Sequence, residues 1–256
     1  MKFSQKHIGL KTVKYYIGTS GYSYAHWKDG IFYPEGLKDN QLLEYYASCF
    51  NTVELNVTFY RIPSQKVFQN WYRRTPSDFK FVVKGTRIIT HLKKLKDYHS
   101  TLKNFLDVCS NLGKKLILIL WQFPPGFKYQ DEKFKNFLQA LSQTRYLYAF
   151  EFRHLSWFNS EVYELLKKFN YTLCIADSPR WPCVEEVTSN YLYLRFHGGR
   201  ILYGSEYSTS ELKKWERKVK GWLSRYEVKT VFAYFNNDAY GFAVKNALTF
   251  RELLVK

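Results

Sequence analysis

Charged and amide side chains recur at the ends of short apolar segments in this sequence, and these side chains could do chemistry. Carboxylates, a lysine and a histidine can transfer protons or attack a substrate. The candidate catalytic residues are Glu54, Lys84, Glu151, Asp177 and His197. Polar and aromatic residues near them could bind a substrate by charge, hydrogen bonds or ring stacking. The candidate substrate-binding residues are Tyr22, Trp27, Asn56, Tyr60, Arg87, His91, Gln122, Arg153, Arg195, Asn236 and Asn237.

The cations among these residues favour an anionic substrate. Arg87, Arg153 and Arg195 can each hold a phosphate group through paired hydrogen bonds, and Lys84 can hold it by its charge. The carboxylates and His197 can then act as general acid or base. We therefore predict an enzyme that hydrolyses a phosphoester, of the phosphodiesterase or nuclease kind, with a small anionic molecule or nucleic acid as its partner. Carboxylates could also hold Mg²⁺ or Mn²⁺, but the neighbouring cations oppose the binding of a metal ion. The sequence therefore does not decide whether the protein uses a metal cofactor.

Three other interpretations remain open. The acids, His197 and the aromatic residues would also suit a sugar isomerase or epimerase. Lys84 could form a Schiff base with a carbonyl substrate if burial or like charge lowered its pKa. The third interpretation is a non-catalytic barrel that binds nucleic acid. In that case pairs such as Glu54 with Lys84 and Glu151 with Arg195 are structural ion pairs.

The segments that must position these residues are predicted to be eight β-strands. Each is short and apolar, and the clearest is residues 52–60, in which apolar and polar side chains alternate. The predicted strands are residues 15–21, 52–60, 79–84, 116–121, 147–154, 172–176, 191–196 and 230–235.

Helical patterns separate nearly all of these strands. Apolar residues recur every three or four positions, and N-cap signals precede several helices, as at Ser64, Asn159 and Ser208 with Glu211. Only the connection between the sixth and seventh strands has a weak helix signal. Eight alternating units in about 250 residues close a barrel of parallel strands. We predict a single (β/α)₈ TIM-type barrel over residues 15–256, preceded by a basic leader at residues 1–14.

The alternation within each strand predicts which side chains enter the barrel. Phe150 and Phe152 suit the helix-facing side, which turns Glu151 and Arg153 inward. In TIM-type barrels the functional residues lie at the C-terminal ends of the strands. The same argument turns inward Glu54, Asn56, Lys84, Tyr193, Arg195 and His197.

The composition indicates a folded globular protein with anionic partners. Hydrophobic residues make up 46% of the 256 residues and aromatic residues 20%, which is enough for a large core. The net charge of +17 favours anionic partners. No apolar run is long enough to cross a membrane and no secretory signal is visible, so we expect a cytoplasmic protein without a membrane partner. The oligomeric state is left open.

Eight motifs occur in order along the sequence. They are Gly18-Thr19-Ser20-Gly21-Tyr22-Ser23-Tyr24 with Trp27, Thr52-Val53-Glu54-Leu55-Asn56 with Thr58-Phe59-Tyr60-Arg61, Ile89-Thr90-His91, Gln122-Phe123-Pro124-Pro125, Glu151-Phe152-Arg153-His154 with Ser156-Trp157-Phe158, Asp177-Ser178-Pro179, Arg195-Phe196-His197-Gly198 and Tyr234-Phe235-Asn236-Asn237. Together these motifs resemble the YecE-like family, also catalogued as domain-of-unknown-function family 72. The resemblance covers about residues 15–255 and implies a TIM-type barrel, but no established activity. One departure is Thr86 before Arg87, where the family more often has serine.

Overall fold

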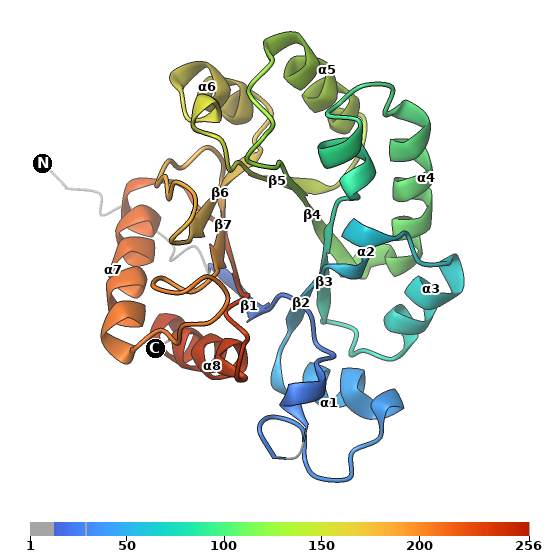
Figure 1. Ribbon diagram of the computed structural model, residues 1–256, viewed down its shortest axis with the longest axis vertical. Helices are drawn as coiled ribbons and strands as arrows, with labels where there is room; N and C mark the ends of the chain where they lie inside the picture. Colours follow the sequence, from blue (N-terminus) through green and yellow to red (C-terminus); the bar gives the residue numbers. More distant parts are fainter. Residues whose placement is uncertain (1–12, 29, 256) are drawn as a thin grey trace, which may run out of the picture.

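The computed structural model describes residues 13–28 and 30–255. Within these ranges, eight strands form one sheet that curves into a ring, and helices α3 to α8 lie around its outside (Figure 1). All neighbouring strands pair in parallel, in the order β1-β8-β7-β6-β5-β4-β3-β2. The predicted single (β/α)₈ TIM-type barrel is therefore confirmed.

The elements follow the predicted alternation. The strands are β1 (Lys14–Thr19), β2 (Thr52–Leu55), β3 (Lys80–Lys84), β4 (Leu116–Gln122), β5 (Leu147–Glu151), β6 (Thr172–Asp177), β7 (Tyr191–Phe196) and β8 (Thr230–Phe235). The helices are α1 (Leu42–Cys49), α2 (Val57–Tyr60), α3 (Gln65–Arg73), α4 (His99–Cys109), α5 (Asp131–Ser142), α6 (Ser160–Lys168), α7 (Thr209–Arg225) and α8 (Phe242–Val255). Short helical turns lie at Ala25–Trp27, Asp39–Gln41, Ile88–Leu92, Ser110–Lys115 and Leu155–Trp157.

The ring closes weakly between its first two strands. β1 pairs with β8 along its whole length, whereas its bond to β2 is an isolated parallel bridge between Ser20 and Glu54. The Ser20 hydroxyl also donates a hydrogen bond to Glu54 Oε1, at 2.7 Å. The residues that close the barrel thus include one of the candidate catalytic carboxylates.

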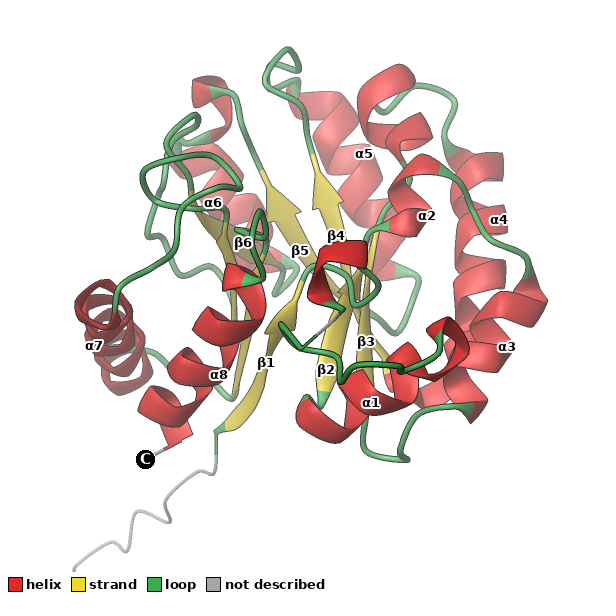
Figure 2. Ribbon diagram, turned by 60° about the horizontal axis from the view of Figure 1, so that its bottom comes forward, coloured by secondary structure: helices red, strands yellow, loops and turns green. Residues whose placement is uncertain are grey.

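Side chains on the two faces of the strands form two separate cores, as the alternation predicts. Phe81, Val83 and Phe150 point outward and pack under the helices. The strands are parallel and run toward one common end of the barrel (Figure 2). The inner core consists of Val82, Leu118, Leu120, Ala149, Cys174, Ala176, Tyr191, Tyr193, Phe232 and Tyr234.

The predicted strand at residues 52–60 is wrong in its second half. β2 ends at Leu55, and Val57–Tyr60 forms helix α2. The Thr58 hydroxyl lies 2.6 Å from the carbonyl oxygen of Lys84 and 3.2 Å from that of Leu55. A side-chain hydroxyl that donates to a backbone carbonyl competes with the backbone hydrogen bonds that would extend the strand, and the Thr58 hydroxyl donates in this way. The helical turn is therefore tied to the end of β3.

The predicted fifth strand is also too long, because β5 ends at Glu151 rather than at residue 154. The His154 side chain accepts a hydrogen bond from the Ser156 amide and so caps the turn Leu155–Trp157. The caps predicted at Asn159 and Ser208 are present. Ser64 occupies its predicted N-cap position without a side-chain hydrogen bond.

Two further predictions concern the ends and connections of the chain. The predicted leader lies mostly in residues 1–12, outside the described residues, and Lys14 already belongs to β1. Between β6 and β7 the described chain contains no helix, in agreement with the weak signal there. No helix in the described ranges is long and apolar enough to span a membrane.

Candidate active site at the barrel mouth

A buried arginine joins two buried glutamates at the C-terminal end of the barrel. Arg195 Nη2 donates a hydrogen bond to Glu54 Oε1 at 2.7 Å, and Nη1 donates to Glu151 Oε2 at 2.5 Å. Arg153 Nε donates to the other oxygen of Glu151 at 2.7 Å, and Tyr193 donates to Glu54 Oε2 at 2.5 Å. Each carboxylate oxygen in this pair therefore has a donor.

These contacts keep both glutamates ionised. Burial alone would raise the pKa of Glu54, but the charge of Arg195 and the hydroxyls of Tyr193 and Ser20 hold it below its usual value. Burial is likewise outweighed at Glu151, where Arg153 and Arg195 hold the pKa well below its usual value. Neither carboxylate can therefore serve as a proton donor near neutral pH.

Lys84, at the end of β3, has no bound acid among the residues that the structure describes. No carboxylate in the described part of the chain lies within 4.0 Å of its ammonium group, which sits 4.0 Å above the centre of the Phe59 ring. Burial and then the charge of Arg195 lower the pKa of Lys84 to about 7, although Glu151 opposes this. A substantial fraction of Lys84 is thus a neutral amine at pH 7.

His197 lies beside this network as a neutral ring. Its Nε2 atom is 3.6 Å from Glu151 Oε2, and Asn236 Nδ2 lies 3.2 Å from its Nδ1 atom. Burial and the charge of Arg195 lower the pKa of His197 to about 4. The amide of Asn236 donates to Nδ1, so Nε2 carries the proton and faces Glu151.

A cavity of about 580 Å³ opens above these residues. The predicted residues on its wall are Asn56, Tyr60, Lys84, Arg153, Arg195 and Asn236. Buried polar atoms near it lack a hydrogen-bond partner within the described ranges, namely Asn56 Oδ1, Arg195 Nε and His197 Nε2. Such orphaned atoms are the groups that a bound molecule would satisfy.

A second, open hollow of about 500 Å³ adjoins this cavity at Arg153. The guanidinium of Arg153 lies 3.7 Å from the ring centre of Trp181, which forms part of the hollow. Arg180 and His154 line the same hollow. Arg153 thus faces two neighbouring spaces, and Trp181 restricts its position by stacking.

The structure places Asp177 apart from the other candidate catalytic residues. Its side chain interacts with Tyr207 and Trp215, on the α7 side of the sheet. Burial raises its pKa, and these two hydrogen bonds oppose the rise. The Asp177 side chain points away from the barrel interior, because side chains alternate along β6 and the inward positions are Cys174 and Ala176.

Three predicted binding residues have structural partners instead of facing the cavity. Trp27 is fully buried, and Asn237 donates hydrogen bonds to the Ser205 carbonyl and to Asn246 Oδ1. Tyr22 accepts a hydrogen bond from the Trp71 indole and lines a separate hollow beside Asn56.

The remaining predicted residues lie near the mouth but off the cavity wall. His91 packs its ring edge-on against Phe59, and burial and the charge of Lys84 lower its pKa to about 4. Gln122 is buried with its amide 3.5 Å from His91 and bonded to the Phe123 carbonyl. Arg87 is exposed, and its charge contributes to lowering the pKa of His91.

Several cavity residues were missed from the sequence. His26 and Asp238 line the cavity and lie 2.8 Å apart, and Tyr24 and Tyr203 form part of its wall. His26 lies in the short helical turn Ala25–Trp27 and the other three lie in loops, and in such segments no period indicates a facing direction. The one available signal was position, because Asp238 comes shortly after the end of β8, behind Asn236 and Asn237.

The site does not fit the divalent metal that the carboxylates suggested. Among the residues that the structure describes, no group of three or more His, Cys, Asp or Glu side chains could hold a metal ion. The oxygens of Glu54 and Glu151 are already bound by arginine, tyrosine and serine. A second cation would meet Arg195 and Lys84 at close range.

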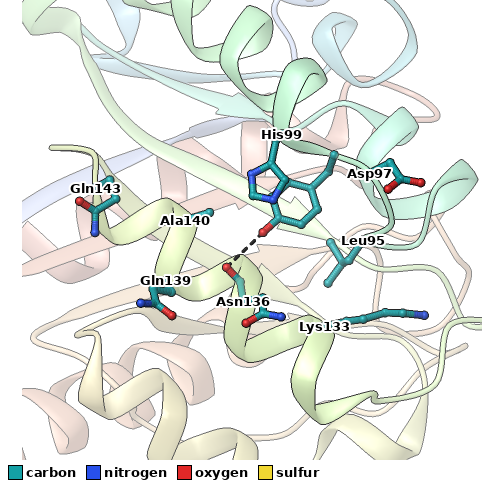
Figure 3. Close-up of a pocket in the computed structure, with 9 residues that line it drawn as sticks. Leu95, Asp97, His99, Lys133, Asn136, Gln139, Ala140 and Gln143 are labelled. Carbon is teal, nitrogen blue, oxygen red and sulfur yellow. Dashed lines mark hydrogen bonds between the residues drawn. The ribbon is translucent and has the colours of Figure 1, made fainter.

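Another hollow, of about 570 Å³, lies on the outside of the barrel between the start of α4 and α5 (Figure 3). His99 stacks on Tyr98 there, and the Tyr98 hydroxyl donates to the Asn136 carbonyl at 3.1 Å. It contains none of the predicted site residues, which favours the mouth as the functional site.

Comparisons with known proteins agree with this architecture. UPF0759 protein YunF of Bacillus subtilis (strain 168) is 28% identical over 272 residues, which cover 93% of this chain and 94% of that protein. UPF0759 protein YecE of Escherichia coli (strain K12) is 30% identical over 145 residues, or 56% of this chain and 50% of that protein. A crystal structure of a DUF72 family protein from Thermotoga maritima MSB8 matches with a TM-score of 0.83 and 37% identity, over 95% of this chain and 100% of that one.

The model of the family described as "Protein of unknown function DUF72" matches residues 16–256, nearly the whole chain. The resemblance seen in the sequence motifs is thereby confirmed: the chain belongs to the DUF72 family.

Proposed function

We propose that the mouth cavity is the active site of an enzyme that hydrolyses a phosphoester of a small anionic substrate. The observation that carries the proposal is Lys84. It lines the cavity without a carboxylate within 4.0 Å in the described chain, next to two arginines whose acids are already bound. A phosphate in this cavity would meet three basic side chains on the wall, and basic groups in a partly enclosed space favour an anion.

The arginines are suited to hold the phosphate. Arg153 and Arg195 both line the cavity, and Arg195 Nε is a buried donor without a partner in the described residues. A phosphate oxygen near this atom would accept its hydrogen bond. Tyr60 and Tyr203, which are 66% and 38% exposed, offer rings on the same wall for a sugar or base.

Lys84 would act as the general base. With a pKa of about 7, it accepts a proton from an attacking water while the arginines stabilise the charge that develops on phosphorus-bound oxygens. Glu54 and Glu151 would not take this role, because Arg195 already occupies them and their pKa values lie below the usual range. Their part is to hold Arg195 in place.

The first test is binding of inorganic phosphate, measured by calorimetry. We expect the native protein to bind it and Arg153→Met to weaken binding at least about tenfold, which corresponds to one lost charged hydrogen bond. Arg217→Met, which changes an exposed arginine on α7, is the matched control. Equal affinities of the native protein and Arg153→Met would refute the phosphate site.

Nucleic acid remains a candidate source of the phosphoester because of the net charge of +17. Binding of a short single-stranded oligonucleotide at several salt concentrations tests it, since phosphate contacts give a steep salt dependence. A flat response would leave only small phosphoesters.

One specific observation favours a second candidate, in which Lys84 forms a Schiff base with a carbonyl substrate. A neutral amine beside the apolar Phe59 ring is the form that attacks carbonyl carbon. Reduction with borohydride in the presence of small phosphorylated aldehydes or ketones would trap the adduct on Lys84. If mass spectrometry finds no added mass on the peptide that contains Lys84, this candidate is excluded.

A further inference from the structure

A second titratable pair lines the cavity and has no part in the mechanism above. His26 Nε2 lies 2.8 Å from Asp238 Oδ2, although the two residues are 212 positions apart in the chain. Both residues lie on the wall of the cavity that also contains Lys84. His26 comes from the turn after β1 and Asp238 from the loop after β8. The pair therefore reaches the cavity from a different wall than Lys84, which is the last residue of β3.

The carboxylate of this pair is held rigidly. Trp27 Nε1 donates to both oxygens of Asp238, at 2.7 and 2.9 Å. Trp27 itself is fully buried, with its ring 4.9 Å from that of Tyr24 and 6.1 Å from that of Tyr33. A carboxylate fixed in this way also fixes the imidazole that it contacts.

A purely structural role does not account for His26. The bond from Trp27 already ties the first loop to the last, and it buries its acceptor, since the Asp238 side chain is 11% exposed. The His26 side chain is 42% exposed and lines the cavity. With Nε2 directed at Asp238, the nitrogen left for other partners is Nδ1.

We propose that His26 is the second proton-transferring residue of the mouth and that Asp238 is its positioning residue. The inference rests on the proposed phosphoester hydrolysis. His26 gives a proton to the oxygen of the departing group, and the carboxylate of Asp238 stabilises the imidazolium that exists before this transfer. Lys84 and His26 then divide the acid and base work that the two glutamates cannot do.

The step balances in atoms and electrons. The attacking water loses one proton to the Lys84 amine, and its oxygen forms the new bond to phosphorus. The bond between phosphorus and the leaving oxygen breaks, and the electron pair stays on that oxygen, which takes the proton from His26. Lys84 ends with one proton more and His26 with one fewer, and exchange with solvent restores both.

Leaving groups of different basicity test this assignment. A p-nitrophenolate departs without protonation, whereas a phenolate departs far more readily when it is protonated. We expect His26→Ala to lower kcat for phenyl phosphate about 100-fold, the contribution typical of a general acid, and to lower kcat for p-nitrophenyl phosphate less than about threefold. Asp238→Asn should give the same selective loss in a smaller degree. His99→Ala, which alters the outer hollow, should change neither rate.

The outcomes distinguish failure of the His26 assignment from failure of the proposed phosphoester hydrolysis. If the native protein hydrolyses neither ester, the proposed function fails and His26 has no reaction to assist. If the native protein hydrolyses both but His26→Ala lowers the two rates equally, hydrolysis stands and the general-acid role is refuted. If Asp238→Asn lowers both rates equally, Asp238 is a structural residue. Selective loss in both variants supports the assignment.

Discussion

Replacing Lys84 with methionine should make the folded protein more stable while abolishing hydrolysis. The native side chain is nearly buried, at 8% exposure, and burial lowers its pKa from the usual 10.5 to about 7. Holding a lysine there therefore costs folding free energy. At about 1.4 kcal/mol per pH unit, the interval from 10.5 to about 7 corresponds to a penalty of about 5 kcal/mol.

The penalty depends on pH with a definite sign. Between about pH 7 and pH 10.5 the unfolded chain keeps the Lys84 proton and the folded protein does not, so stability rises with pH across this window. The penalty is complete below pH 7 and disappears above pH 10.5. At pH 9 about 2 kcal/mol of it remains.

Other contacts reduce the expected gain. Methionine is close in size to the lysine stem, but it loses the attraction between the ammonium and the Phe59 ring, worth about 1–2 kcal/mol when partly buried. We therefore expect Lys84→Met to raise the free energy of unfolding by about 3 kcal/mol at pH 6. At pH 9 the folded Lys84 is neutral and has no ammonium attraction to lose, so the expected gain is about 2 kcal/mol.

Urea denaturation of both proteins at the two pH values measures this difference. Lys66→Met, which removes a lysine from the exposed face of α3, is the control for loss of surface charge. A gain that is the same at pH 6 and pH 9, or a loss of stability at both, would refute the argument that Lys84 is a strained cation. Such a result would also remove the amine from its role as base.

Three further predictions address other parts of the site. Arg195→Met should lower the free energy of unfolding by about 3–5 kcal/mol, because it leaves two buried carboxylates without their shared partner, and urea denaturation measures the loss. Asp177→Asn should leave phosphate affinity unchanged within about twofold, and a larger change in calorimetry would return Asp177 to the site. Gly85→Ala should lower the melting temperature by several degrees, because its Cβ atom would lie 2.2 Å from the Trp121 ring; Gly126→Ala, which meets no atom within 4 Å, is the control.

The alternation of side chains predicted much of the mouth, because facing direction is a local property of a strand. It placed Glu54, Lys84 and Arg195 inside the barrel, and they meet there. It predicted the partners only in part: Glu151 does contact Arg195, one of the two pairs considered from the sequence. Glu54 and Lys84 were candidate partners, but Glu54 binds Arg195, which is 141 residues away. Pairing across a barrel depends on strand order and stagger, which no local pattern records.

Loops show the other limit of sequence reasoning. His26 and Asp238 lie in segments without a period, and only the folded chain shows that they meet. Asp177 was misplaced for the opposite reason, because position at a strand end was given more weight than alternation. The inward positions Cys174 and Ala176 already indicated that Asp177 faces α7. The helical turn after Leu55 is tied to the end of β3 by the hydroxyl of Thr58 in α2, and this contact between distant residues is also a tertiary effect.

The isolated bridge between Ser20 and Glu54 has a consequence for the dynamics of the barrel. Regions held by few backbone hydrogen bonds open first when a protein fluctuates, and their amide protons exchange soonest with solvent. We expect the amide of Gly21, which donates to the Glu54 carbonyl at 2.9 Å, to exchange faster than the amides between β7 and β8. Each such opening would separate Ser20 from Glu54 while the rest of the barrel stays folded. A ligand that holds Arg195 in place should slow this exchange, so protection at Gly21 would report occupancy of the mouth even for a substrate that is never turned over.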